Sequence, residues 1–186
     1  MKNLIPALLT VVLFTACGNT TQQQPSAETA SEPATARVET SDAFKSSFDA
    51  TLDAYFQLKD ALVETDAATA GELAAELASR IESVSTGDLN ADAAALWNGQ
   101  GVQAGQAAAL IVDEADVETQ RLHFETVSNA YIEMVKAYGP FENVIYRQTC
   151  PMVRGGSADW LSKEERVMNP YHGDRMLNCG SVVERI

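Results

Sequence analysis

The sequence has few basic residues, and this shortage excludes two kinds of partner. Only 13 of its 186 residues are lysine or arginine, against 26 aspartates and glutamates, which gives a formal net charge of −13. A protein that binds nucleic acid needs a basic face for phosphate contacts. Docking on anionic lipid likewise needs a basic patch. The composition therefore argues against both.

Histidine and cysteine are also scarce, with two and three residues respectively. A structural zinc site usually takes four such ligands, and metal sites inside helical bundles use inward glutamates or Glu-x-x-His pairs that are missing here. The chain also lacks a phosphate-binding loop and a supported nucleophile–base pair. Cys150 and His172 could resemble the nucleophile–base pair of a cysteine hydrolase, but the sequence around them does not support that role. We therefore predict that the protein is not an enzyme.

Long apolar runs are absent too. The run from Leu4 to Phe14 is far shorter than the ~20 residues that a membrane-spanning helix needs, so it predicts a cleaved export signal over residues 1–16. The next residue, Cys17, follows small residues in a string that resembles a bacterial lipoprotein box. The resemblance implies that Cys17 is lipidated. Gly18 after it, in place of aspartate, implies sorting to the outer membrane, facing the periplasm.

Residues 17–40 then predict a lipidated cysteine followed by a disordered tether. The segment consists mainly of Gln, Thr, Ser, Ala, Pro and Glu and has almost nothing to bury. About 145 residues remain after it, which is enough for one domain with a real core.

Apolar residues recur at helical spacing from residue 41 to residue 140. Start and stop signals predict four helices, beginning at Ser41 or Asp42, at Asp66, near Asp92 and at Asp116, the last one stopped by Gly139-Pro140. Glycines weaken the third helix by ~1 kcal/mol each and favour a break near Asn98–Gly101. Short connections between the four predict an all-α fold, an antiparallel up-down four-helix bundle.

The tail, residues 141–186, differs from the helical part and is assigned to the same domain. It has six basic and six acidic residues, whereas residues 41–140 have five and seventeen, a net charge of −12. We expect an irregular segment packed on the bundle, with a turn at Gly155-Gly156, an anchor at Trp160 and a tight turn at Asn169-Pro170. Because such a segment has few apolar residues of its own, it needs a cross-link.

Sulfur and imidazole side chains gather in this tail, namely Cys150, Met152, His172, Met176 and Cys179. Thiolate and thioether sulfur select soft ions such as Cu(I). Cys150 and Met152 would share one side of an extended segment, and Met176 and Cys179 would share one face of a helical turn. A fold that joined the two pairs would offer two thiols and two thioethers to one ion, with His172 nearby.

The same cysteines fit a second interpretation, which spacing alone slightly favours. Cysteines in an oxidising compartment usually form disulfides, and methionines usually fill gaps in a core. A Cys150–Cys179 disulfide would close a loop of about 30 residues and contribute roughly 3–4 kcal/mol in the chain-entropy model. The protein would then be a non-catalytic structural or partner-binding lipoprotein.

Several strings of the sequence carry a resemblance, namely Cys150-Pro151-Met152, Trp160-Leu161-Ser162, Asn169-Pro170-Tyr171, Gly173-Asp174, Met176-Leu177 and Cys179-Gly180, with Gln120-Arg121 and Phe124 upstream. Over residues 44–186 the chain resembles a bacterial domain family of unknown function. That family occurs in exported proteins and lipoproteins, and is appended to periplasmic adaptor subunits of copper/silver efflux pumps. The resemblance implies that the tail handles Cu(I) or Ag(I), for sequestration or for hand-over to an efflux adaptor.

The tail also resembles, more weakly, a short heavy-metal-binding module that begins Cys-Pro-Met-His-Pro and ends Cys-x-x-Cys-Gly-Met. This chain has Val153 in place of the histidine and one cysteine, Cys179, before the final glycine. The ligand set of that module is therefore not carried over in full.

Overall fold

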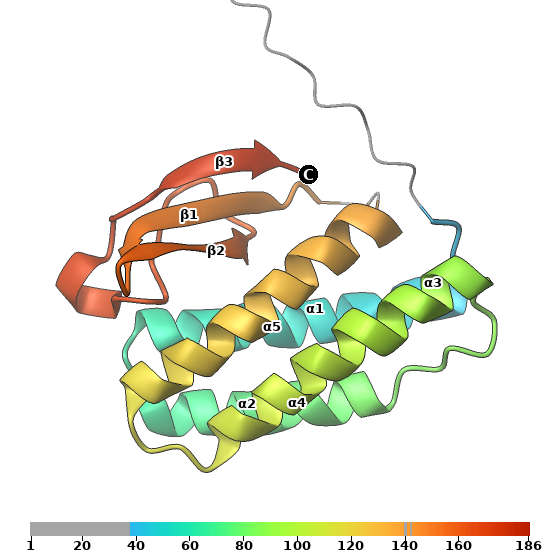
Figure 1. Cartoon of the computed structure of the whole chain (residues 1–186), viewed down its shortest axis with the longest axis horizontal. Coiled ribbons are helices and arrows are strands. Elements are labelled where there is room, and N and C mark those ends of the chain that lie inside the picture. Colours follow the sequence, from blue (N-terminus) through green and yellow to red (C-terminus); the bar gives the residue numbers. More distant parts are fainter. Residues whose placement is uncertain (1–37, 140, 142) are drawn as a thin grey trace, which may run out of the picture. The chain divides into compact units, whose positions relative to one another are not determined.

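The chain folds into four helices followed by a small antiparallel sheet (Figure 1), in a computed structural model that describes residues 38–139, 141 and 143–186. The helices are α1 (Asp42–Val63), α2 (Ala67–Glu82), a third helix made of α3 (Ala91–Leu96), a π-helical turn (Trp97–Gly101) and α4 (Val102–Val112), and α5 (Val117–Tyr138). All described residues belong to one compact unit. The predicted export signal, the lipidation of Cys17 and most of the tether lie outside the described residues.

Side-chain caps start the helices where the sequence predicts. The Ser41 hydroxyl accepts a hydrogen bond from the backbone N–H of Phe44 at 3.2 Å. Asp66 and Asp116 each accept one from the N–H three residues further on, at 3.0 Å. These contacts satisfy N–H groups that a helix start otherwise leaves unpaired. Within the described residues, none of the resulting helices combines the length and apolarity needed to cross a bilayer.

The helices pack as consecutive neighbours, α1 on α2, α2 on α4 and α4 on α5. Their core is aromatic, with six buried side chains, namely Phe44, Phe48, Tyr55, Phe56, Phe124 and Tyr131. Tyr138 adds an edge-to-face contact with Phe44 at a centroid distance of 4.9 Å. Pairs of this kind contribute beyond their buried area.

The third helix is irregular where its glycines predict weakness, but it bulges instead of breaking. Trp97–Gly101 forms a π-helical turn that keeps α3 and α4 continuous. The turn directs Trp97 inward, where only 4% of it is exposed. A Cβ at Gly101 would lie 2.8 Å from the Trp97 ring, so this position requires glycine. A π-bulge inserts one residue without ending the helix.

The prediction of an all-α fold is wrong for the tail, which is largely strand. β1 (Tyr146–Val153), β2 (Gly156–Ser162) and β3 (Ser181–Arg185) form one antiparallel sheet in the order β2-β1-β3. The β1–β2 hairpin turns at Arg154-Gly155, one residue before the predicted Gly155-Gly156, and Gly156 begins β2. β2 packs on α5, and Trp160 is fully buried, as expected of an anchor. A 3₁₀ turn, Gly173–Met176, lies in the connection that returns the chain to β3.

Candidate functional site

Cys150 and Cys179 lie in contact although they are 29 positions apart. Their Sγ atoms are 3.5 Å apart. Cys150 is fully buried in β1, whereas Cys179, just before β3, is partly exposed, and both are free thiols. The separation exceeds the ~2.05 Å of a disulfide and fits two thiols in contact. We call these two residues the thiol pair.

The contact between the two thiols affects the pKa of Cys179. The hydrogen bond with Cys150 raises the pKa of the Cys179 thiol above its ordinary value, and burial and the charge of a second thiolate act in the same direction. A cation bound to both sulfurs would remove the repulsion between two thiolates, at the cost of releasing their protons.

A β-bulge decides which side chain of β1 accompanies Cys150. Cys150 pairs with Ala158 and Val153 pairs with Gly156, so β1 has one residue more than β2 between these two pairs. The extra residue shifts the alternation of faces. Cys150 and Val153 are buried, while Met152 is 60% exposed. The prediction that Cys150 and Met152 share a face is therefore wrong.

Asn169 positions the other cysteine. Its side-chain Nδ2 donates to the Cys179 carbonyl oxygen at 2.9 Å, and its Oδ1 accepts from the Tyr171 N–H at 2.8 Å. Its backbone N–H donates to the Leu177 carbonyl oxygen at 2.8 Å. The predicted turn at Asn169-Pro170 thus closes the loop that ends at Cys179. The prediction missed this role, which the side-chain hydrogen bonding of asparagine in turns could have indicated.

Gly180 lets the backbone approach closely enough for the two sulfurs to meet. Its φ is +140°, and a Cβ there would lie 2.4 Å from the Thr149 carbonyl oxygen and 3.1 Å from the Trp160 ring. A side chain at this position would push the strand-entry segment away from β1. The sulfur contact therefore depends on glycine after Cys179.

Of the other three candidate ligands, Met176 lies on the turn of Cys179, whereas Met152 and His172 lie at the bulge of β1. Met176 is partly buried, and its carbonyl oxygen accepts from the Cys179 N–H at 2.9 Å, so the two share one turn, as expected. His172 Nε2 donates to the Met152 carbonyl oxygen at 3.2 Å, so both lie at the bulge of β1. In the part of the chain that the structure describes, no three His, Cys, Asp or Glu side chains are close enough to hold one metal ion. The ligand roles stay predictions.

Arg121 attaches the loop that carries Met176 and Cys179 to the helices. It is 1% exposed, and its Nε and Nη2 donate to the carbonyl oxygens of Pro170 and Leu62, both at 2.8 Å. Glu118 accepts from Arg121 and from Arg175 on the 3₁₀ turn, at 2.6 Å each. Burial would raise the pKa of Glu118, but the hydrogen bonds from the two arginines outweigh it and lower that pKa.

One family matches this chain. The sequence model of the family described as "Protein of unknown function (DUF3347)" matches residues 51–143, half of the chain. The matched part runs from within α1 to just past α5, so it contains Arg121 and neither cysteine of the thiol pair. No curated protein and no solved structure matches.

Proposed function

We propose a soft-metal-binding function for this chain, which belongs to the family described as "Protein of unknown function (DUF3347)". The thiol pair takes one Cu(I) or Ag(I) ion, which the protein sequesters or hands over. The observation that carries the proposal is the 3.5 Å between the Cys150 and Cys179 sulfurs. It is a binding protein in this proposal, not an enzyme.

The chemistry of two thiols favours a soft ion over a hard one. Thiolate sulfur selects Cu(I)-like ions, whereas carboxylate oxygen selects hard ions. An ion about 2.3 Å from each sulfur, a typical zinc–thiolate distance, can bridge two sulfurs 3.5 Å apart. A low number of ligands keeps transfer to another site easy. The partly exposed Cys179 gives the ion a way in and out.

Met176 is the best third ligand because it shares a turn with Cys179. Its thioether would add a third sulfur ligand to the site. Met152 and His172 belong to the wider set, but they lie at the bulge of β1. They would join the ion only if the backbone there rearranged.

The proposed location and the proposed recipient of the ion rest on the predicted export signal and on the resemblance of the tail. Cleavage before Cys17 and its lipidation would anchor the protein in the outer membrane, facing the periplasm, through acyl chains alone. The tether would hold the domain away from the lipid. A copper/silver efflux adaptor is the proposed recipient of the ion.

The same distance also supports the alternative, a Cys150–Cys179 disulfide in a structural or partner-binding lipoprotein. The sulfurs would have to approach by about 1.5 Å to reach the ~2.05 Å of an S–S bond. Oxidation would then abolish the metal site. A thiol titration of purified protein without reductant, with Cys17→Ser to leave two cysteines, separates the two readings. Two free thiols support the metal site, and none supports the disulfide.

Binding itself is tested by anaerobic Cu(I) titration against a competing chelator. We expect one ion per chain, an affinity at least about 100-fold lower in Cys179→Ser, and one about tenfold lower in Met176→Leu. Met152→Leu is the matched control, because Met152 is 60% exposed and lies off the thiol pair. If neither Cys179→Ser nor Met176→Leu changes the affinity, the metal assignment is wrong.

A further inference from the structure

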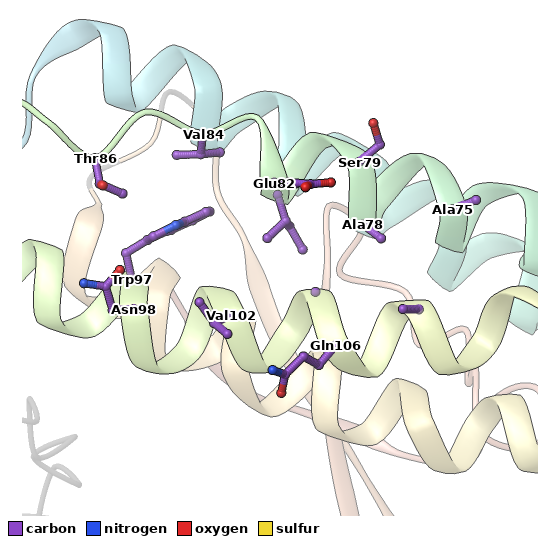
Figure 2. A pocket seen from close by; sticks show the side chains of 13 residues that line it. Ala75, Ala78, Ser79, Glu82, Val84, Thr86, Trp97, Asn98, Val102 and Gln106 are labelled. Atoms are coloured by element: carbon purple, nitrogen blue, oxygen red, sulfur yellow. The ribbon is translucent and has the colours of Figure 1, made fainter.

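A groove with a volume of about 640 Å³ lies between α2 and the third helix, and no member of the thiol pair lines it. Small side chains on facing helices leave the space open, among them Ala75 and Ala78 on α2 and Gly105 and Ala109 on α4. At one end the Trp97 side chain extends from the π-helical turn toward Val84 (Figure 2). The bulge thus builds the end wall of this groove.

The groove has the length of a short helix. Its lining on the third helix runs from Trp97 to Ala109. At 1.5 Å per residue that is about 18 Å, or just over three helical turns. An amphipathic helix lying in such a groove contacts it through residues at i, i+4 and i+7. Polar side chains along it, such as Ser79 and Gln106, can orient an occupant by hydrogen bonds.

The third helix presents no charge to this groove. Residues 93–112 contain no Asp, Glu, Lys or Arg, in a chain that is 21% charged. Two apolar side chains of this run are exposed, Val102 by 47% and Leu110 by 59%. Depletion of charged residues is a compositional mark of the core of a protein interface.

The surroundings of the groove are acidic. Glu82 lines it, and Glu72, Asp92 and Asp113 lie just beyond the lining segments in the sequence. None of these four forms an ion pair within residues 38–139, 141 and 143–186. Arg80, the basic residue of α2, is paired with Glu76. A third helix without charge, together with unpaired carboxylates at Glu82 and further along the two helices beyond the groove, fits an occupant with the reverse pattern. We call these four carboxylates the acidic rim.

We propose that this groove binds an amphipathic helix of a partner protein. The contact face of that helix is apolar, and lysines or arginines flank it. A second copy of this chain fits less well, because it would bring one acidic rim against another. The basic flanks would pair with the rim, while apolar side chains fill the space between the facing alanines. This inference is independent of metal binding.

The test uses a fluorescein-labelled 18-residue probe peptide of leucine, alanine and lysine, with leucines at i, i+4, i+7 and i+11 and lysines beside them. Fluorescence anisotropy measures its affinity for the mature protein. We expect Ala75→Gln combined with Ala109→Gln to weaken binding at least tenfold, because both side chains enter the groove. Ala68→Gln is the matched control, an exposed alanine of α2 outside the groove. Circular dichroism verifies that each variant folds.

Two control peptides and the salt dependence test the sequence pattern and the charge of the probe. A scrambled peptide of the same charge and a version with glutamate for lysine should both bind at least tenfold more weakly. Higher salt should weaken the binding of the probe peptide, since its flanks are charged. Equal binding by Ala68→Gln and the groove variant, or by the scrambled peptide, overturns the proposal. So does a dimer in light scattering that Ala109→Gln dissociates, since the occupant is then a second copy.

Discussion

The Arg121 guanidinium lies 2.8 Å from the Pro170 carbonyl oxygen and thereby joins α5 to the loop that carries Met176 and Cys179. The same side chain reaches the end of α1 through the Leu62 carbonyl oxygen and the Thr65 hydroxyl, at 2.8 and 3.0 Å. One buried arginine thus fixes the loop against two helices. Its planar fork of donors serves several acceptors at once, which a lysine cannot do.

Arg121→Lys should therefore destabilise the protein although it keeps the charge. Buried acceptors lose their donor and the ammonium is poorly placed, so we expect a loss of about 3 kcal/mol in the free energy of unfolding by urea. Arg80→Lys is the control, because Arg80 lies in a half-exposed pair with Glu76 and should cost about 0.5 kcal/mol. Equal losses in the two variants would show that Arg121 does not fix the loop.

The sequence predicts the helices better than the tail for a physical reason. Caps at Ser41, Asp66 and Asp116 and long apolar stripes are local signals, and the helices begin where these residues indicate. The glycines of the third helix locate its irregularity, but not whether it breaks or bulges. That choice depends on the inward packing of Trp97, which is a tertiary contact.

The sheet and the thiol pair depend on contacts between distant residues. β3 has only five residues and pairs with β1 about 35 positions away, so no local pattern identifies it. Spacing correctly placed Met176 and Cys179 on one turn. It failed for Cys150 and Met152, because strand alternation holds only until a bulge inserts a residue. Bulges arise from pairing, and pairing is not visible in one strand.

Gly180→Ala should displace the backbone next to Cys179 and thereby disturb the thiol pair. The φ of +140° disfavours any side chain, and the new Cβ would collide with the Thr149 carbonyl oxygen. We expect a loss of at least ~2 kcal/mol in urea unfolding and slower air oxidation of the two thiols. Gly99→Ala is the matched control, since nothing lies within 4 Å of its Cβ position. A Gly180→Ala protein that oxidises at the normal rate would contradict this role.

Asn169→Asp should destabilise the loop although the two side chains have nearly the same shape. The substitution keeps the acceptor for the Tyr171 N–H but removes the Nδ2 donor to the Cys179 carbonyl oxygen. Two oxygens then face each other in a buried place, so we expect about 2 kcal/mol less stability by thermal denaturation. Alkylation of Cys179 should become faster. Asn129→Asp, at an exposed position of α5, should change neither quantity.

The raised pKa of Cys179 predicts the direction in which the pH dependence of its reactivity changes in a variant. Because the hydrogen bond with Cys150 is the largest cause of the shift, Cys150→Ser should lower that pKa toward the ordinary value. Iodoacetamide reacts with the thiolate, so the midpoint of its rate against pH should move to lower pH in the variant.

The protons of the two thiols compete with the metal ion for the sulfur atoms. Below the thiol pKa values each thiolate ligand releases one proton on binding, so the logarithm of the Cu(I) affinity should rise by up to about two for each pH unit. In Cys150→Ser the slope should fall to about one, because one thiolate remains. A slope that is the same in both proteins would mean that Cys150 does not contact the ion, whatever its distance from Cys179.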